Sequence, residues 1–449
     1  MSTHRAGRPA RPLAMIASVL ACLFIIVGDG TSVAGIQGSG FRSKAAGRIT
    51  QFGSIFVNGV EYDISAARIL IDGEPGTESR LRVGQVVTVE GEVNAEGTAG
   101  DATDVRFSSD VRGPIAQVNL ADGSLVILGQ RIRILSDTIL DGLPLGGILG
   151  LLPGIQVQVS GFPNASGELV ASRIDLVLGG PANARVKGIV QGLDTTAHTF
   201  RVNTQTVSYS GVTPVGTLAN GSIVSVGGNI PAGQTSLQAT HVEVISGLGG
   251  AADERGQIEG LITGFNSAAD FAIGAQRVST DASTQFVLHG QVLGPNLAVD
   301  VQGTFDAAGV LVARKVEARS GGGLLGGLVG GLVGGLLGGS SGAPGGLAGV
   351  LGPVESVSVS DGSLRVLGVD LEISGATAFD DQSNQSLRPF GLPELRVGDY
   401  VEVRGGALGS SGGVQATVVK RDDAGNAVYL EGAATSLAFP SFNVLGVPV

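Results

Sequence analysis

The stretch "GQVVTVEG", residues 84–91, alternates apolar and polar residues between two glycines, and the chain contains five versions of it. The others are "GIQVQVSG" at 154–161, "GSIVSVGG" at 221–228, "NLAVDVQG" at 296–303 and "GDYVEVRG" at 398–405. A period of two with one apolar face is typical of a half-buried β-strand. The chain is therefore a repeat protein, whose unit recurs after 70, 67, 75 and 102 residues.

The first position of this stretch predicts a turn. After Gly, Asn is the residue that best tolerates positive φ, so a column of glycines with one Asn indicates a left-handed turn that leads into the strand. The column consists of Gly84, Gly154, Gly221, Asn296 and Gly398. We expect the strand itself to end at the closing glycines, Gly91, Gly161, Gly228, Gly303 and Gly405.

A second column follows the strand and contains only alanine. Its members are Ala102, Ala171, Ala239, Ala313 and Ala416. A residue this small in every unit indicates a place where two backbones pass too closely for a larger side chain. In a small closed barrel, this is where the last strand crosses another strand.

Each unit opens with a glycine and an apolar residue two positions later, and a hairpin follows. The clearest hairpin is "SIFVNGVEYDI", in which Asn58-Gly59 predicts a two-residue type I′ turn. One unit thus contains five or six short strands in about 65 residues, without a helix. Closure into a small barrel of the OB or SH3-like kind would remove exposed edges, and we favour an OB-like barrel over an open sandwich.

These patterns predict an all-β chain, a tandem array of small five- to six-stranded closed barrels. Because such small units bury little surface, contacts between neighbours are expected to matter. The expected segments are a signal peptide at 1–34, repeats at 47–109, 110–180, 183–247, 254–319 and 347–423, a Gly/Leu-rich linker at 320–346, and a partial sixth repeat at 427–449.

Two segments leave alternatives open. The uncharged stretch 321–346 is either a flexible linker or an apolar, self-associating or membrane-touching segment. The last residues repeat the opening of a unit, with Gly432 first and a hairpin last. Either the chain is cut short there, or these strands pair with another unit or another molecule.

The N-terminus has the order of a secretory signal. Arg5, Arg8 and Arg11 precede an uncharged run of about 15 residues, which is shorter than the roughly 20 that a membrane-spanning helix needs. Cleavage after Ala34 would give an exported protein of the periplasm or cell surface. "VLAC" also resembles a lipoprotein box, so Cys22 is a possible lipidation site. A lipid attached there is the one membrane anchor that we expect. Since Cys22 is the only cysteine, disulfides are excluded.

Composition excludes nucleic acid as an expected partner. The net charge is −11, and removal of residues 1–34, with three arginines and one aspartate, makes it −13. Nucleic-acid binding needs a basic surface, which this chain does not offer.

The stretch "GRITQFGSIFVNGVEYDIS", followed by "LRVGQVVTVEGEVNAEGTAGDATDV", resembles the opening of a family of bacterial exported repeats known as domain of unknown function 5666. The resemblance is most specific in the first unit and covers most of residues 47–423. It implies small envelope-associated β-domains, often in tandem after a signal or lipoprotein peptide, and no known catalytic residues.

No motif predicts chemistry. His198, His241 and His289 share no metal-binding spacing, and the nucleophile elbow, the P-loop and the dinucleotide fingerprint are absent. Asp380 and Asp381 with Asn384 do not match a calcium loop, so no catalytic, cofactor-binding or metal-binding residues are expected.

These observations predict a non-enzymatic scaffold or binding module of the cell envelope, with an envelope protein or glycan as its unknown partner. Two alternatives are kept. One is an envelope hydrolase with carboxylates from adjacent repeats, and the other is self-association through the Gly/Leu segment and the partial sixth repeat.

Overall fold

A computed structural model describes residues 40–143, 147–179, 183–319, 347–375, 377–408, 413–438 and 440–449. The signal peptide at 1–34, Cys22 and the linker at 320–346 lie outside these residues. The described residues are almost entirely strands, with three short 3-10 helices, η1 (Glu78–Arg80), η2 (Ile148–Gly150) and η3 (Leu392–Glu394). Across the described part of the chain, no helix is long and apolar enough to span a membrane.

The first two units contain thirteen strands. Unit one comprises β1 (Phe41–Gln51), β2 (Ile55–Val57), β3 (Val60–Asp63), β4 (Arg68–Ile71), β5 (Glu74–Pro75), β6 (Val86–Val93) and β7 (Ala99–Phe107). Unit two comprises β8 (Val111–Asn119), β9 (Ser124–Ile127), β10 (Gln130–Arg133), β11 (Ile139–Asp141), β12 (Gln156–Pro163) and β13 (Leu169–Leu176).

The later units repeat this order. Unit three comprises β14 (Ala184–Asp194), β15 (Thr199–Val202), β16 (Gln205–Ser208), β17 (Ile223–Asn229) and β18 (Leu237–Ile245). Unit four comprises β19 (Arg255–Ser267), β20 (Asp270–Ile273), β21 (Gln276–Ser279), β22 (Gln285–Val287), β23 (Ala298–Phe305) and β24 (Leu311–Ala318). Unit five comprises β25 (Leu347–Ser358), β26 (Ser363–Val366), β27 (Val369–Glu372), β28 (Ala378–Asp381), β29 (Tyr400–Leu408) and β30 (Gly413–Asp422). The last segment holds β31 (Tyr429–Glu431), β32 (Ala434–Ala438), β33 (Ser441–Val444) and β34 (Val447–Pro448).

Each of the five units closes into a ring of five strands. In unit one, β1 pairs with β2, β2 with β3, β3 with β7, β7 with β6, and β6 again with β1. Only the β3·β7 pairing is parallel, and units two to five repeat the same set of pairings. The expected all-β array of OB-like barrels is confirmed.

The column of four glycines and Asn296 leads into the fourth strand of each ring. All five residues have positive φ, between 66° and 92°. The backbone N–H of each donates to the carbonyl of the apolar residue two positions after the opening glycine of its unit, as Gly84 does to Ile49 at 2.8 Å. The turn thereby fixes the register of the first and fourth strands.

The expectation that the strand ends at the closing glycines is wrong. Each of these glycines lies inside its strand, at a β-bulge, and pairs with the alanine of the second column, as Gly91 does with Ala102. A Cβ on Gly161 would lie 2.9 Å from the Val170 carbonyl carbon, closer than real Cβ atoms approach. Glycine is needed here because the two backbones are in contact, and the strand continues beyond it.

The alanines divide the last strand between two partners. In unit one, residues 99–101 of β7 pair with β3, and residues 104–107 pair with β4, with Ala102 in between. In units two, four and five, a threonine hydroxyl donates to the carbonyl of this alanine at 2.7–2.8 Å. The bulge thus turns the last strand from one neighbour to the next, and the threonine satisfies the carbonyl oxygen.

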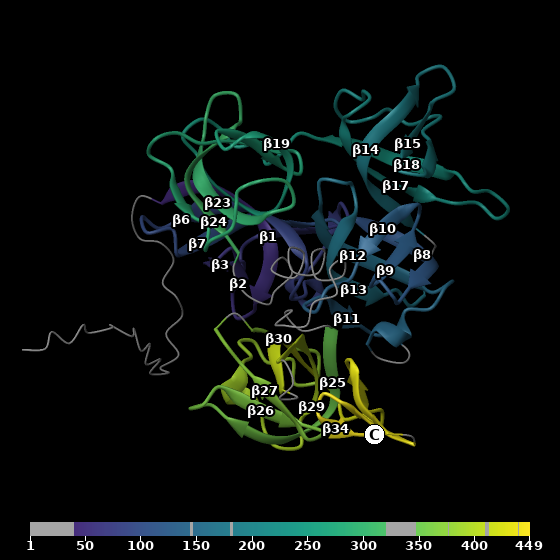
Figure 1. Cartoon of the computed structure of the whole chain (residues 1–449). Coiled ribbons are helices and arrows are strands. Elements are labelled where there is room, and N and C mark those ends of the chain that lie inside the picture. Colours follow the sequence, from purple (N-terminus) through teal and green to yellow (C-terminus); the bar gives the residue numbers. More distant parts are fainter. Residues whose placement is uncertain are drawn as a thin grey trace, which may run out of the picture.

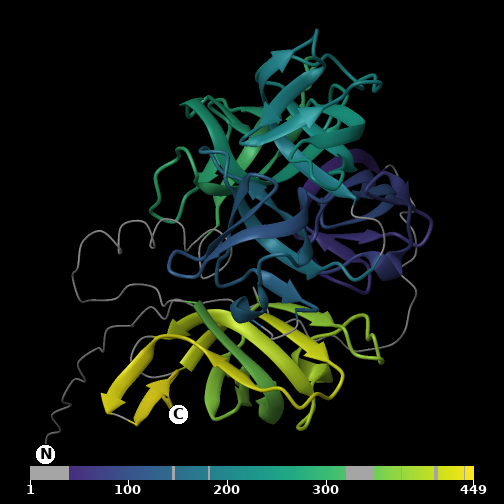
Figure 2. The same ribbon diagram turned by 90° about the vertical axis from the view of Figure 1, so that its right-hand side faces the viewer.

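The units cluster around units one and two. Unit five and the last segment lie below the other four units, and units three and four lie above (Figures 1 and 2). Contacts therefore extend beyond sequence neighbours and join unit one to units four and five, and unit two to the same pair. A simple linear array would join only consecutive units.

First strands join the barrels to each other. Strand β1 pairs in parallel with β19, β8 pairs antiparallel with β14, and β25 pairs antiparallel with β31. The strand β1 begins at Phe41, before the expected start of repeat one at residue 47, so sequence analysis missed the residues that form this junction. The last segment, one of whose open alternatives was pairing with another unit, lies on unit five.

We predict that Gly161→Ala destabilises the protein by about 1–3 kcal/mol, because the new methyl group meets backbone that cannot move aside. The matched control is Gly294→Ala, where an added Cβ meets no atom within 4 Å. Thermal unfolding followed by circular dichroism measures both. Equal melting temperatures for the two variants would contradict the role assigned to the bulge.

Candidate functional site: charged junctions between the barrels

The residues singled out from the sequence lie at turns and bulges and do not form a common site. Both columns are spread over five separate barrels, one residue of each column per barrel. His198 and His241 lie in unit three and His289 in unit four, and no group of three or more potential metal ligands occurs in the described residues. The ionisable residues that the structure brings together lie instead where barrels meet.

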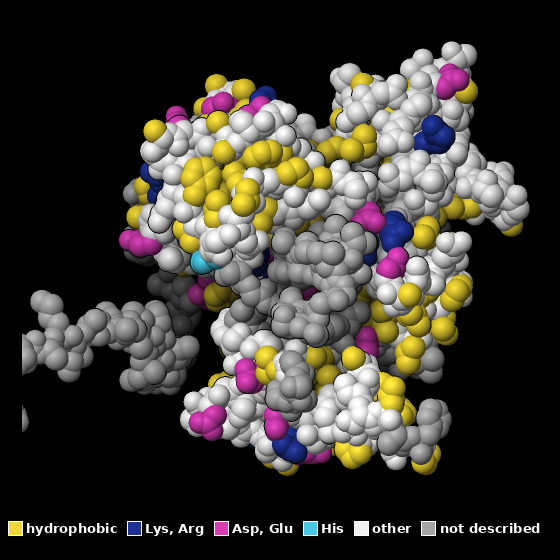
Figure 3. All heavy atoms as spheres, in the orientation of Figure 1, with side chains coloured by type: hydrophobic (Ala, Val, Ile, Leu, Met, Phe, Trp, Pro, Cys, Tyr) yellow, Lys and Arg dark blue, Asp and Glu magenta, His cyan; other side chains and the backbone are white. Residues whose placement is uncertain are grey.

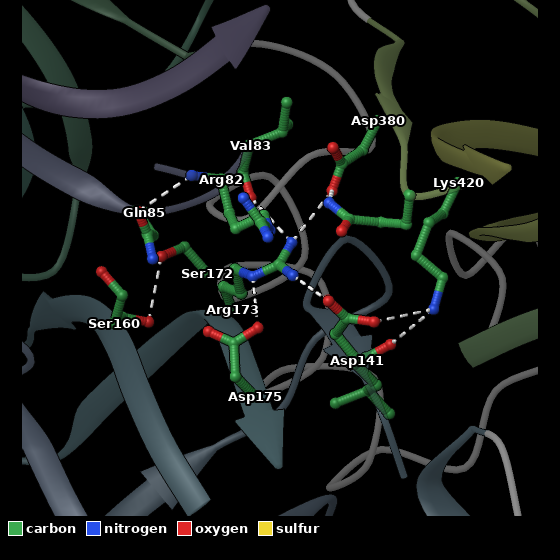
Figure 4. Close-up of polar contacts among 12 residues, drawn as sticks. Arg82, Val83, Gln85, Asp141, Ser160, Ser172, Arg173, Asp175, Asp380 and Lys420 are labelled. Atoms are coloured by element: carbon green, nitrogen blue, oxygen red, sulfur yellow. Dashed lines mark hydrogen bonds and ion pairs between the residues drawn. The ribbon is translucent and has the colours of Figure 1, made fainter. Parts of the chain in front are cut away.

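The first charged cluster joins units one, two and five. Its centre is Arg173, which is fully buried, and its guanidinium donates to Asp141, to Asp175 at 2.5 Å and to Asp380 at 3.2 Å (Figure 4). It also donates to the backbone carbonyl of Val83 at 3.1 Å. A single side chain of unit two thus holds an aspartate of unit five and the backbone of unit one.

Lys420 of unit five crosses the same junction in the opposite direction. Its ammonium lies 3.3 Å from Asp141 of unit two (Figure 4). It also lies 2.9 Å from Glu402 and 3.2 Å from Asp422 of its own unit. Burial acts to lower its pKa, but Glu402, Asp141 and Asp422 outweigh burial, so the pKa is raised. Lys420 therefore stays charged at any physiological pH.

The two carboxylates of unit two in this cluster have pKa values that are shifted in opposite directions. Burial acts to raise the pKa of Asp141, but the charges of Arg173 and Lys420 lower it to about 2. Burial raises the pKa of Asp175, although its carboxylate contacts Arg173. Asp141 therefore lies between Arg173 of its own unit and Lys420 of unit five, and it links units two and five through Lys420.

A second charged cluster joins units one, two and four. Arg48 of unit one lies 3.2 Å from Asp137 of unit two and 3.1 Å from Glu259 of unit four. Glu259 also faces Arg319 at 3.3 Å, and Arg319 lies 3.7 Å from Asp300. Three carboxylates share two guanidinium groups here, so the cluster is short of positive charge.

This shortage appears in the pKa values. Burial raises the pKa of Asp137 to about 6, and the nearby Arg48 offsets burial only in part. Burial likewise raises the pKa of Asp300 to about 6 against the charge of Arg319. Asp137 Oδ1 is buried and has no hydrogen-bond partner among the described residues. These two aspartates accept protons more readily than ordinary carboxylates do.

A polar hollow of about 280 Å³ lies between units one and five, close to the first cluster. Its lining residues are Glu78, Ser79, Arg82, Asp381, Gln382, Ser386 and Arg388. Arg388 is paired with Glu78 at 3.3 Å, and Asp381 with Arg421 at 2.5 Å. Within the described residues, no carboxylate lies within ion-pair distance of Arg82, whose Nη1 donates only to backbone carbonyls. The hollow thus presents one guanidinium that has no carboxylate in direct contact among the described residues.

Sequence analysis considered Asp380 and Asp381 only as calcium ligands, and the structure pairs them with Arg173 and Arg421. It missed Arg173 and Lys420, because the outward residues of the strands differ from unit to unit and no column marks them. The one usable signal was the run of charges at 420–423 in a chain with only 15% charged residues.

We predict that Arg173→Met destabilises the protein by about 3–5 kcal/mol, because it leaves buried carboxylates without their cation. The control is Arg131→Met, whose side chain is 45% exposed and pairs with Asp122 and Glu168. Loss of such a surface pair costs less than about 1 kcal/mol. Calorimetric melting temperatures of both variants test this, and an unaffected Arg173→Met protein would show that the cluster does not hold the units.

We also predict a pH dependence centred on Asp137. Since its pKa in the folded protein is raised from 3.8 to about 6, the folded state binds the proton more tightly than the unfolded chain. The resulting stabilisation is complete below pH 3.8 and is lost as the pH rises through 6, by up to about 3 kcal/mol.

The variant Asp137→Asn mimics the protonated side chain. Its melting temperature relative to the wild type should therefore be higher at pH 7 than at pH 4.5, measured by differential scanning fluorimetry. A melting temperature of Asp137→Asn that falls relative to the wild type as the pH rises would contradict the raised pKa of Asp137. Because the lowered pKa of Asp141 acts only below pH 3.8, it does not interfere in this range.

Comparison with known families assigns the repeat to a family. The model of a domain of unknown function, DUF5666, matches the chain five times, at residues 46–105, 112–175, 187–243, 259–317 and 352–420. These matches coincide with the five closed barrels and together cover more than half of the chain. No curated protein matches the sequence. The chain belongs to the DUF5666 family, with five copies of the domain in tandem.

Proposed function

We propose that this protein is an exported, non-enzymatic scaffold of the bacterial cell envelope that binds an acidic glycan between units one and five. The observation that carries the proposal is that the buried carboxylates at the junctions are ion-paired, whereas Arg82 in the hollow between units one and five contacts no carboxylate of the described residues. The junction carboxylates Asp137, Asp380 and Glu259 are buried and paired with arginines of other units, so they hold barrels together.

A non-enzymatic role is supported by what the repeat retains. The residues common to all units are the glycines and Asn of turns and bulges, the alanines opposite the bulges, and buried valines. A hydrolase would need an acid and a base that substrate can reach. The carboxylates brought together from different barrels are ion-paired in the interior, which favours a structural role for them.

The hollow between units one and five is the proposed binding site. Burial and the nearby charge of Arg173 lower the pKa of Arg82, so an anion beside it would relieve both effects. The neighbouring side chains of Gln382, Ser79 and Ser386 offer hydrogen-bonding groups of the kind that sugars use. A glycan carboxylate fits this combination, because guanidinium groups bind carboxylates in a bidentate manner.

The surface supports the choice of partner. On the face shown in Figure 3, Lys and Arg side chains are scattered singly and form no basic stripe. A nucleic-acid ligand would require such a stripe. Export is supported by the N-terminal sequence alone, with cleavage after Ala34 or lipidation at Cys22 as the two processing routes.

We predict that the mature chain binds uronic-acid oligosaccharides in isothermal titration calorimetry, and that Arg82→Ala weakens binding at least tenfold. Arg131→Ala, which removes an exposed arginine of unit two, is the control and should bind as the wild type does. Equal affinity of the Arg82→Ala and wild-type chains would remove the glycan site. Fractionation of cells that express the full chain tests export separately, since a cytoplasmic, unprocessed product would contradict an envelope role.

A further inference from the structure

The junctions between first strands share one location in the repeat. In every unit, the residues just before the opening glycine pair on one side within their own barrel and have a second edge that the barrel leaves open. We call these residues the coupling edge. The coupling edges of the five barrels comprise residues 43–46, 111–112, 185–186, 255–258 and 349–351, and the equivalent residues of the last segment are 429–431, whose strand pairs only with β25. Each of them pairs with one other coupling edge, so units one and four, two and three, and five and the last segment form couples.

Two of the couples have the same register. Val111 lies opposite Val186 in the couple of units two and three, and Val350 lies opposite Leu430 in the couple of unit five and the last segment. Both pairings are antiparallel. All four residues stand two positions before an opening glycine, namely Gly113, Gly188, Gly352 and Gly432. A register with the same position on both sides is that of a local twofold axis.

Hairpin turns make a second shared contact. A Cβ on Gly129, in the first hairpin of unit two, would lie 2.8 Å from the backbone nitrogen of Gln205 in the hairpin of unit three. In unit five, the corresponding Gly368 faces Val447 of the last segment at 3.6 Å by the same measure. The last segment therefore occupies on unit five the place that unit three occupies on unit two.

Side chains fasten the last segment to this place. The hydroxyl of Tyr429 donates to Glu402 at 2.6 Å, and Glu431 lies 3.2 Å from Arg404, which is 1% exposed. Leu430 packs against the core of unit five, together with Val444 and Leu445 of the last segment. Strand β31 pairs with β25, and Figure 2 shows the yellow last segment beside the green strands of unit five.

We propose that the coupling edge of unit five, residues 349–351, is a docking surface for a second copy of this chain, and that residues 427–449 keep it closed. Displacement of β31 exposes an unpaired strand edge beside an apolar surface. Such edges pair readily with an equivalent edge. The register of the two antiparallel couples then predicts an isologous dimer with Val350 opposite Val350 of the second copy.

The test uses the full chain with Cys22→Ser. Leu430→Pro removes a backbone donor from β31 and should release the last segment. The mass measured by light scattering is expected to double relative to the parent chain, which stays monomeric. Leu437→Pro, which alters an exposed residue of β32 outside the contact with β25, is the matched control and should leave the mass unchanged.

A cysteine at the axis identifies the interface. In the Leu430→Pro chain, Val350→Cys should give a disulfide-linked dimer on oxidation, whereas Ser363→Cys on β26 should not. An added peptide of residues 427–449 should return the dimer to half its mass. A folded Leu430→Pro chain that remains monomeric, or a dimer that Cys at 350 does not link, would overturn the proposal.

If Leu430→Pro prevents folding, Glu431→Lys replaces it, because the new cation opposes Arg404 without altering the backbone. The same doubling of mass is then expected, and a monomer would overturn the proposal equally. Dimerisation that requires an intact last segment, seen as loss of mass in Leu430→Pro, would also contradict it. None of these results depends on the glycan site.

Discussion

The bulge at which a glycine backbone lies against an alanine is the constraint on which every barrel depends. The last strand must pair with the fourth strand on one side and with two successive partners on the other. A regular strand cannot change partner midway, and the extra residue of a bulge supplies the bend. In unit five, Gly405 and Ala416 meet at this point, and Val414–Gln415 and Val418–Arg421 pair with different strands on either side of it.

Closure of the barrels has a consequence for their surfaces. Five strands that pair in a ring leave no free edge except where the first strand extends beyond its hairpin, and that extension is what joins one barrel to the next. Strands of units one and four thus belong to one continuous hydrogen-bonded sheet, although each barrel remains closed. Each barrel is therefore closed by its own strand pairings, while backbone hydrogen bonds between first strands continue from one barrel to the next.

The residues that are the same in every repeat could be predicted from the sequence. The turns at Gly84 and Asn296 and the small residues at Ala102 could be predicted, because each demands a backbone conformation or a clearance that few residues meet. The expectation that the strand ends at Gly91 was wrong, since glycine is common both at strand ends and at bulges. The junctions could not be found, because Arg173 meets Asp380 across 207 residues and no pattern links them.

The parallel pairing of β1 with β19 also constrains how the protein reaches its final form. Ser43 pairs with Arg255, so the edge of unit one is synthesised long before the strand that pairs with it. An early barrel with an unpaired edge is exposed to association with other nascent chains. The junction of units one and four therefore forms only after unit four has been synthesised, and the order of synthesis becomes part of the folding pathway.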